Sequence, residues 1–192
     1  DMLLEKPVTN NREELLKLKD CATQNGARLM ICHVLRYTPF YSAIKKEVLS
    51  GEIGKIVNIQ TNEFVAICHA SHSYIRGKWN NREKCGSSML LAKCSHDIDL
   101  LCWLNNTTVP ERVTSMGGRY FFIEKNAPEN SGTRCLVDCP IEKDCIYSAR
   151  KLSLEHDFFP WLAWDCFKKD PESVTAEEKE ESLKTNNPQG RC

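Results

Sequence analysis

Four polar side chains gather on one predicted helix, at residues 88–104. At about 100° of rotation per residue, Lys93, His96 and Asp97 fall on one side of this helix, and Asp99 lies at the border of that side. Histidine is the side chain best suited to proton transfer near neutral pH, and a nearby carboxylate can fix its tautomer. The pattern indicates acid–base chemistry, although an ordinary solvated helix face with surface ion pairs has the same pattern.

The residues before this helix predict a strand, a helix and a second strand. Residues 2–4 are a short apolar run, and Thr9 or Asn10 is suited to cap the helix that follows. Asn25-Gly26 is typical of a helix C-terminus, and residues 28–34 form the next apolar run. This order and spacing indicate a βαβ unit with parallel strands.

The middle of the chain predicts a further helix and two longer strands. The helix covers residues 40–49 and ends at Ser50-Gly51. Strands are predicted at residues 55–66, where polar and apolar residues alternate imperfectly, and at residues 112–122. Residues 67–87 between them are polar and irregular, and a loop of this length is usually functional or disordered.

The composition excludes two classes of partner. Lys and Arg number 26, as do Asp and Glu, so the balance of charge favours neither a nucleic-acid nor a membrane surface. No apolar stretch approaches the ~20 residues of a membrane helix.

An odd number of cysteines, eleven, is a poor disulfide framework and predicts a reducing compartment, the cytoplasm. The cysteines predicted to be small buried hydrophobes are Cys21, Cys32, Cys68, Cys94 and Cys102.

Part of the long loop is rich in side chains that suit a sugar-like ring. Arginine donates hydrogen bonds to hydroxyls or a carboxylate, and tryptophan offers a flat apolar face. The predicted substrate-binding residues here are His72, Tyr74, Arg76 and Trp79. An ordinary surface loop can share this composition. His69 and His72 have a spacing seen in metal sites, but two ligands without a third are weak evidence.

Three cysteines lie close together near the C-terminal end of the chain. Cys135, Cys139 and Cys145 have the clustering of thiolate ligands for structural zinc or an iron–sulfur cluster. Unpaired thiols and a disulfide are the alternatives. The possible metal ligands are therefore these three residues.

Three segments, in this order and spacing, resemble the Gfo/Idh/MocA family, the superfamily of glucose–fructose oxidoreductase and inositol dehydrogenase. Glu5-Lys6-Pro7 follows the first strand, and Arg36-Tyr37-Thr38-Pro39 follows the second. A helix then ends in Gly51-Glu52-Ile53-Gly54, and the last segment is Leu91-Ala92-Lys93-Cys94-Ser95-His96-Asp97-Ile98-Asp99-Leu100-Leu101. The resemblance covers residues 1 to about 123.

The resemblance implies an α/β fold in two parts. Residues 1–38 would be the C-terminal part of a Rossmann domain that binds NAD or NADP. Residues 39–192 would be an α+β domain with a mainly antiparallel open sheet, which carries substrate and oligomer contacts. Residues 124–192, which contain the three cysteines, are predicted to be irregular.

The resemblance also implies roles for residues at matching positions. The predicted catalytic residues are Lys6, His96 and Asp99. His96 would take the proton of a substrate hydroxyl, and Lys6 would orient that hydroxyl or stabilise its developing charge. The residues implied to line the cofactor are Glu5, Lys6, Pro7, Arg36 and Tyr37, and Lys93 joins the predicted substrate site.

The chain departs from the family pattern in two places. The first aspartate of the family's helix motif falls on Ala92, and its glycine on Cys94. No Gly-x-Gly-x-x-Gly turn follows a strand, and residues 1–7 have the pattern of a buried strand's end. We therefore expect further sequence before Asp1 and expect this chain to be inactive by itself.

Three functions stay open. The first is an NAD(P)-dependent oxidoreductase that acts on a sugar, a cyclitol or a related polyol. The second is a non-redox binding or regulatory relative, and the third is a glycosidase that uses tightly bound NAD for transient oxidation. Lys6 and His96 favour an enzyme, and a homo-oligomer, dimer or tetramer, is expected.

Overall fold

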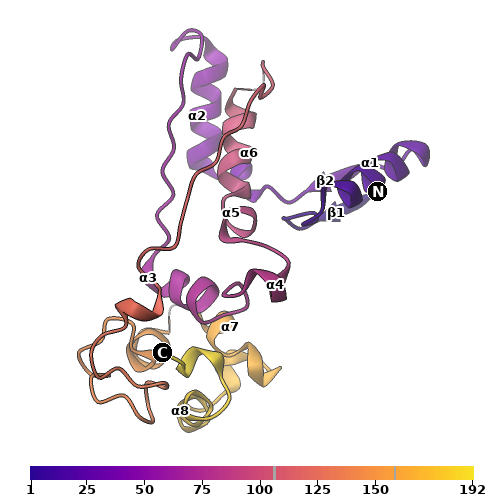
Figure 1. Cartoon of the computed structure of the whole chain (residues 1–192). Coiled ribbons are helices and arrows are strands. Elements are labelled where there is room, and N and C mark those ends of the chain that lie inside the picture. The colour runs from indigo at the N-terminus through magenta and orange to yellow at the C-terminus, as the bar shows by residue number, and fades with distance from the viewer. Residues whose placement is uncertain (106, 158) are drawn as a thin grey trace. The chain divides into compact units, whose positions relative to one another are not determined.

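The structure is a computed structural model that describes residues 1–105, 107–157 and 159–192. The chain forms two compact units. Unit 1 contains residues 1–63 and 86–115, and unit 2 contains residues 64–85 and 116–192. Each unit is described by itself, and Figure 1 labels the elements of both. The domain boundary expected at residue 38 stays a prediction.

Unit 1 begins with the βαβ unit that the sequence predicts. Strands β1 (Met2–Leu4) and β2 (Leu29–Ile31) pair in parallel, and α1 (Arg12–Gln24) connects them. The helix begins at Asn11, whose side chain accepts hydrogen bonds from the backbone N–H groups of Glu13 and Glu14. The cap is therefore one or two residues later than expected.

A single 3-10 turn, η1 (Val34–Tyr37), leads from β2 into α2 (Pro39–Ser50). Thr38 caps α2, and Pro39 occupies its first turn, where a proline costs no hydrogen bond. Gly51 follows with φ +82°, a left-handed conformation that ends helices at glycine. The predicted helix at residues 40–49 is confirmed.

The single helix predicted at residues 88–104 is two helices. Helix α5 (Met89–Ala92) begins at Ser88, and α6 (Ser95–Leu104) begins after Cys94. The apolar and polar residues keep a helical period across the break, so the sequence pattern gives no sign of it. The break places the first turn of α6 shortly after Lys93 and beside Lys6.

The predicted mainly antiparallel open sheet is wrong. Within the described residues the paired strands are β1 and β2, and the other regular elements are helical (Figure 1). Residues 55–66 and 112–122 form no strands, and Val57 and Val113 are 95% and 86% exposed. An alternating pattern indicates extended backbone, but a strand also needs a hydrogen-bonding neighbour. No described segment of this chain supplies one to these residues.

Unit 2 is helical, and it includes most of the stretch that was predicted to be a loop. In that stretch lie α3 (Ile67–His69), the π-helical turn η2 (Ala70–Ile75) and α4 (Arg82–Cys85). The predicted irregular segment is also folded. Its elements are η3 (Glu124–Asn126), η4 (Arg150–Glu155), α7 (Pro160–Ala163), η5 (Asp165–Phe167), η6 (Pro171–Ser173), α8 (Ala176–Lys184) and η7 (Pro188–Gly190).

The core of unit 2 is built around Trp164. The indole is completely buried and packs with Cys135, Ala149, Ala163 and Leu183. Aliphatic, thiol and aromatic groups from well-separated parts of the sequence therefore share one interior. This explains why residues 124–192 fold although their sequence has no clear period.

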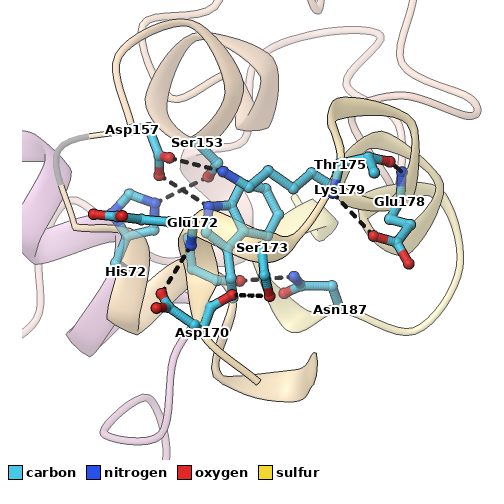
Figure 2. A network of polar contacts seen from close by, with 12 residues as sticks. His72, Ser153, Asp157, Asp170, Glu172, Ser173, Thr175, Glu178, Lys179 and Asn187 are labelled. Carbon is cyan, nitrogen blue, oxygen red and sulfur yellow. Dashed lines mark hydrogen bonds and ion pairs between the residues drawn. The ribbon is translucent and has the colours of Figure 1, made fainter. Parts of the chain in front are cut away.

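Polar contacts surround this core. The indole Nε1 of Trp164 donates a 2.9 Å hydrogen bond to Asp157, and Lys179 lies 3.1 Å from the other oxygen of that carboxylate. Figure 2 shows the side chains of Asp157 and Lys179 pointing toward one another. Thr175 and Glu178 form a reciprocal capping box that begins α8. The indole N–H and both oxygens of the Asp157 carboxylate are thus paired.

The cysteines differ from their predicted burial. Cys68 is buried, Cys32 and Cys94 are half-buried, and Cys21 and Cys102 are exposed. Cys21 and Cys102 lie on faces of α1 and α6 that no described segment covers, although both positions fit an apolar stripe. In the part of the chain that the structure describes, no helix has both the length and the apolar character needed to cross a bilayer.

Candidate active site on the first turn of α6

Lys6 is held at the break between α5 and α6. Its Nζ donates a 2.8 Å hydrogen bond to the backbone carbonyl of Ala92. In a continuous helix this carbonyl would accept from the N–H of His96, but that N–H donates instead to the carbonyl of Lys93, at 3.4 Å. The break therefore leaves a backbone acceptor for Lys6, and the lysine lies beside the first turn of α6.

His96 lies in that first turn and faces a second histidine, His33. The two ring centroids are 6.3 Å apart, with an edge-to-face angle of 78°. Nδ1 of His33, Nδ1 of His96 and Oγ of Ser95 are buried and form no hydrogen bond with the described residues. Buried polar atoms nearly always have a partner. These three atoms therefore mark a place where a bound molecule or water would complete the hydrogen bonding.

The surroundings of His96 favour its neutral form. Burial, followed by the charges of Lys6, His33 and Lys93, lowers the pKa of His96, and Asp97 opposes this. Burial and the charge of Lys93 also lower the pKa of Lys6. A neutral imidazole at neutral pH can accept a proton, which is what a general base requires.

Asp99 binds Arg36 and His33. The Nε and Nη2 groups of Arg36 both donate to its carboxylate, with a distance of 2.7 Å from Nε to Oδ2. Nε2 of His33 lies 3.5 Å from Oδ1 of the same carboxylate. No hydrogen bond between Asp99 and His96 is present among the described residues, although the sequence places them one helical turn apart. Asp99 therefore positions Arg36 and His33, and it can reach His96 only through His33.

Two further residues complete the cluster, and the sequence analysis missed both. His33 directly follows the apolar run of β2, and a polar residue at the carboxyl end of a parallel strand is a usable signal for a binding site. Glu63 forms a 3.0 Å ion pair with Lys93, so the charge that was assigned to substrate binding already has a partner. The Glu63 contact has no signal in the sequence because the two residues lie far apart along the chain.

The residues implied to line the cofactor meet at one edge of the β1–β2 pair. Glu5-Lys6-Pro7 follows β1 and Arg36-Tyr37 follows β2, and the two strands are parallel neighbours. Ligands of open α/β sheets bind at the carboxyl ends of such strands. Arg36 is fixed by Asp99, while Tyr37 is 68% exposed. The cofactor-binding roles of these residues stay predictions, and the sequence has no glycine-rich turn for a pyrophosphate.

The other predicted substrate residues belong to unit 2. His72 is buried there, with Nε2 2.9 Å from the hydroxyl of Ser153 (Figure 2). Arg76 is also buried, and Tyr74 and Trp79 are half-buried. Their substrate-binding roles stay predictions. Lys93 is the one member of the predicted substrate set that unit 1 brings to the Lys6 and His96 cluster.

The three-cysteine metal site is wrong. Among the described residues, no three His, Cys, Asp or Glu side chains are grouped so that they could hold a metal ion. Cys135 is buried in the core of unit 2, Cys139 and Cys145 are half-buried, and all three are free thiols. Cys135 packs in the core around Trp164, and the three thiols are not grouped as ligands of one ion.

A groove of about 350 Å³ lies on another part of α6, and none of Lys6, His33 or His96 lines it. Its walls are the C-terminal half of α6 and two extended segments, with Ile56, Val57, Ile59, Leu101 and Val109 among the lining residues. Its lining has apolar and uncharged polar side chains and no acid–base pair. We therefore assign the candidate site from its titratable side chains.

The buried histidines make the stability of this chain depend on pH. The pKa of His72 and that of His96 are both lowered, in each case mainly by burial, while the unfolded chain titrates near the ordinary value of 6.5. Below pH 6.5 the unfolded state binds more protons than the folded state, so the free energy of unfolding falls as the pH decreases from 6.5. Urea midpoints at about pH 7.5 and pH 5.5 should show this loss, and His72→Gln should reduce it. A midpoint that stays constant or rises at the lower pH would contradict the prediction.

Comparison with known proteins shows two similarities, one to a family model and one to a single protein. Residues 41–131 match the model of the Gfo/Idh/MocA C-terminal domain. Over 154 residues the chain is 25% identical to the Bacillus subtilis (strain 168) protein named "Putative oxidoreductase YteT". The alignment covers 78% of this chain and 35% of that protein, so the chain spans about a third of its relative's length. No solved structure matches the chain.

Proposed function

Because the chain is a relative of the Gfo/Idh/MocA oxidoreductases, we propose that the full-length protein is an NAD(P)-dependent oxidoreductase of a sugar, a cyclitol or a related polyol. The comparisons support an oxidoreductase, and the redox cofactor and the sugar-like substrate are the proposed extension.

The arrangement of Lys6 and His96 carries the proposal. The Lys6 ammonium group donates a 2.8 Å hydrogen bond to the Ala92 carbonyl, next to the start of α6. The first turn of α6 contains the half-buried imidazole of His96, whose pKa is lowered. A cation and a neutral base beside one another are what the oxidation of an alcohol requires, because the hydroxyl must be oriented and must lose its proton.

The residues of this chain then have separate tasks. His96 accepts the hydroxyl proton, and Lys6 stabilises the negative charge that develops on the substrate oxygen. Asp99 holds Arg36 and His33 at the same edge of the β1–β2 pair. When it is bound, the nicotinamide supplies the hydride acceptor.

The hydrogen bond of Lys6 to the Ala92 carbonyl lies at the position where this chain departs from the family's helix motif. The family's helix motif has an aspartate where this chain has Ala92, and here the carbonyl of that same residue holds the lysine. A carbonyl accepts a hydrogen bond but carries no full charge, so it fixes the ammonium group without neutralising it. Lys6 therefore keeps its positive charge available to the substrate oxygen.

Lys6→Met in the full-length protein tests this assignment. Methionine keeps the length and removes the charge, so kcat/KM for the best substrate should fall about 10²-fold, as when one charge-stabilising group is lost. Formation of reduced nicotinamide is measured with NAD⁺ and NADP⁺ over a panel of sugars, sugar acids, cyclitols and other polyols. Lys17→Met, at an exposed position of α1, is the matched control and should keep full activity. Full activity of Lys6→Met would remove the lysine from its proposed role.

The same panel separates the alternatives. A dehydrogenase forms reduced nicotinamide in proportion to product. An enzyme that oxidises only transiently releases a cleaved glycoside with no net reduction of the cofactor, and a binding relative binds a ligand but converts none. The proposal predicts the first of these results.

Location and assembly are part of the proposal. The eleven cysteines all lie within the described residues and are free thiols, which agrees with a reducing compartment such as the cytoplasm. A homo-oligomer, dimer or tetramer, stays a prediction that sedimentation of the full-length protein would check.

A further inference from the structure

Unit 2 contains a cavity of about 380 Å³ that the proposed chemistry of Lys6 and His96 does not use. Segments from both ends of unit 2 line it. The charged and amide-bearing lining residues include Arg76, Lys78, Lys84, Asp165, Gln189 and Arg191. A cavity of this volume is in the range of small-molecule sites.

The charge of the lining is strongly unequal. Arg76, Lys78, Lys84 and Arg191 contribute four cationic groups, whereas Asp165 is the acidic residue among the lining side chains. None of the four cations forms an ion pair with the described residues. A concave surface with this imbalance attracts small anions.

Arg76 is the buried member of this set, at 6% exposure. Its Nε donates a 2.7 Å hydrogen bond to the carbonyl of Arg191, and its Nη2 group donates to the carbonyl of Tyr147. These carbonyls fix the plane of the guanidinium without neutralising its charge. Nη1 forms no hydrogen bond with the described residues. A buried cation with no carboxylate partner is costly, and an anion in the cavity would offset that cost.

Gln189 lines the same cavity and has an unpartnered acceptor. Its side chain is 2% exposed, and Nε2 donates a 3.0 Å hydrogen bond to the carbonyl of His72. This bond fixes which end of the amide is the oxygen. Oε1 is buried and has no partner among the described residues. A hydroxyl group of a ligand would satisfy it, because an oxygen that only accepts needs a donor.

We propose that this cavity of unit 2 binds a small hydroxylated anion, such as a sugar that carries a carboxylate or a phosphate. The anionic group would be bound by the Arg76 guanidinium and the ammonium groups of Lys78 and Lys84, and a ligand hydroxyl would donate to Oε1 of Gln189. All residues of this site belong to unit 2, so a failure of anion binding would leave the chemistry proposed for Lys6 and His96 untouched.

Binding is tested by titration calorimetry on the 192-residue chain, with glucuronate, glucose 6-phosphate and neutral glucose as probes. Both anions or one of them should bind more tightly than glucose, and the tighter of the two identifies the anionic group. Because hydrogen bonds to charged groups contribute about 1.5–3 kcal/mol, replacing both Lys78 and Lys84 by Gln should raise the Kd at least ~10-fold. Both lysines are exposed, so this variant keeps the core of the unit.

A second variant separates the two halves of the proposed site. Gln189→Met should weaken the binding of the hydroxylated anions and leave the binding of inorganic phosphate unchanged, since phosphate does not need the Oε1 acceptor of Gln189. Lys143→Gln, at an exposed position that does not line the cavity, is the control. Equal binding of glucose and both anions, no binding of any probe, or a Kd that the double lysine variant does not change would each overturn the proposal.

Discussion

Replacing His96 by alanine in the full-length protein should lower kcat by at least ~10²-fold, the usual contribution of a general base. The imidazole is half-buried beside Lys6, and burial keeps its pKa low, so at neutral pH it is ready to take a proton. Alanine removes the proton acceptor and leaves the anchor between Lys6 and the Ala92 carbonyl intact. Substrate binding is therefore expected to change less than turnover, and kcat and KM are to be measured separately.

The control for this variant is His156→Ala, which removes an exposed histidine of unit 2 that lies outside both proposed sites. It should retain the parental kcat. If His96→Ala also turns over at the parental rate, His96 is not the base. His33 would then be the next residue to replace, because its ring faces His96 and also has a buried Nδ1 without a partner.

Trp164→Ala should lower the free energy of unfolding by about 3–5 kcal/mol, as large aromatic truncations in protein cores do. The indole is completely buried among Cys135, Ala149, Ala163 and Leu183. Truncation leaves a cavity there and removes the hydrogen-bond donor to Asp157. It also removes the ring that lies 5.2 Å beneath the Lys179 ammonium. Urea unfolding of the 192-residue chain, followed by circular dichroism, measures the loss.

Trp161→Ala is the matched control. Trp161 lies in the same short helix region but is 60% exposed, so its removal should change stability by no more than about 0.5 kcal/mol. A similar loss for the two variants would mean that Trp164 does not form the core of unit 2. Because a weakened unit 2 would also disturb its cavity, anion binding is best measured on variants other than Trp164→Ala.

The two units bear on function in different ways. Unit 1 holds the lysine, the two histidines and the Asp99–Arg36 ion pair, for which we propose redox chemistry. Unit 2 has a separate, well-packed core and a cationic cavity. A ligand of the cavity and a substrate of unit 1 can therefore be measured in separate experiments.

The sequence by itself determined the local structure of the βαβ unit and of α2. The βαβ unit and α2 could be predicted closely because their signals are local. These signals are the helix caps, the glycines Gly26 and Gly51, and the short apolar runs of β1 and β2. Lys6 and His96 could also be proposed as site residues from the sequence, because both belong to motifs of contiguous residues.

Only the tertiary structure decided how distant segments meet. Residues 55–66 and 112–122 were predicted to be strands, yet hydrogen bonding between strands depends on a partner that a local pattern does not specify. A local pattern also did not specify the ion-pair partner of Asp99, which is Arg36 and not His96. Nor did it specify the backbone carbonyls that hold the buried guanidinium of Arg76. The strand pairing, the ion pair and the buried guanidinium each depend on contacts between residues far apart along the chain. The helix break beside Lys6 depends on such a contact too, so the sequence predicted the helix of His96 but not its break.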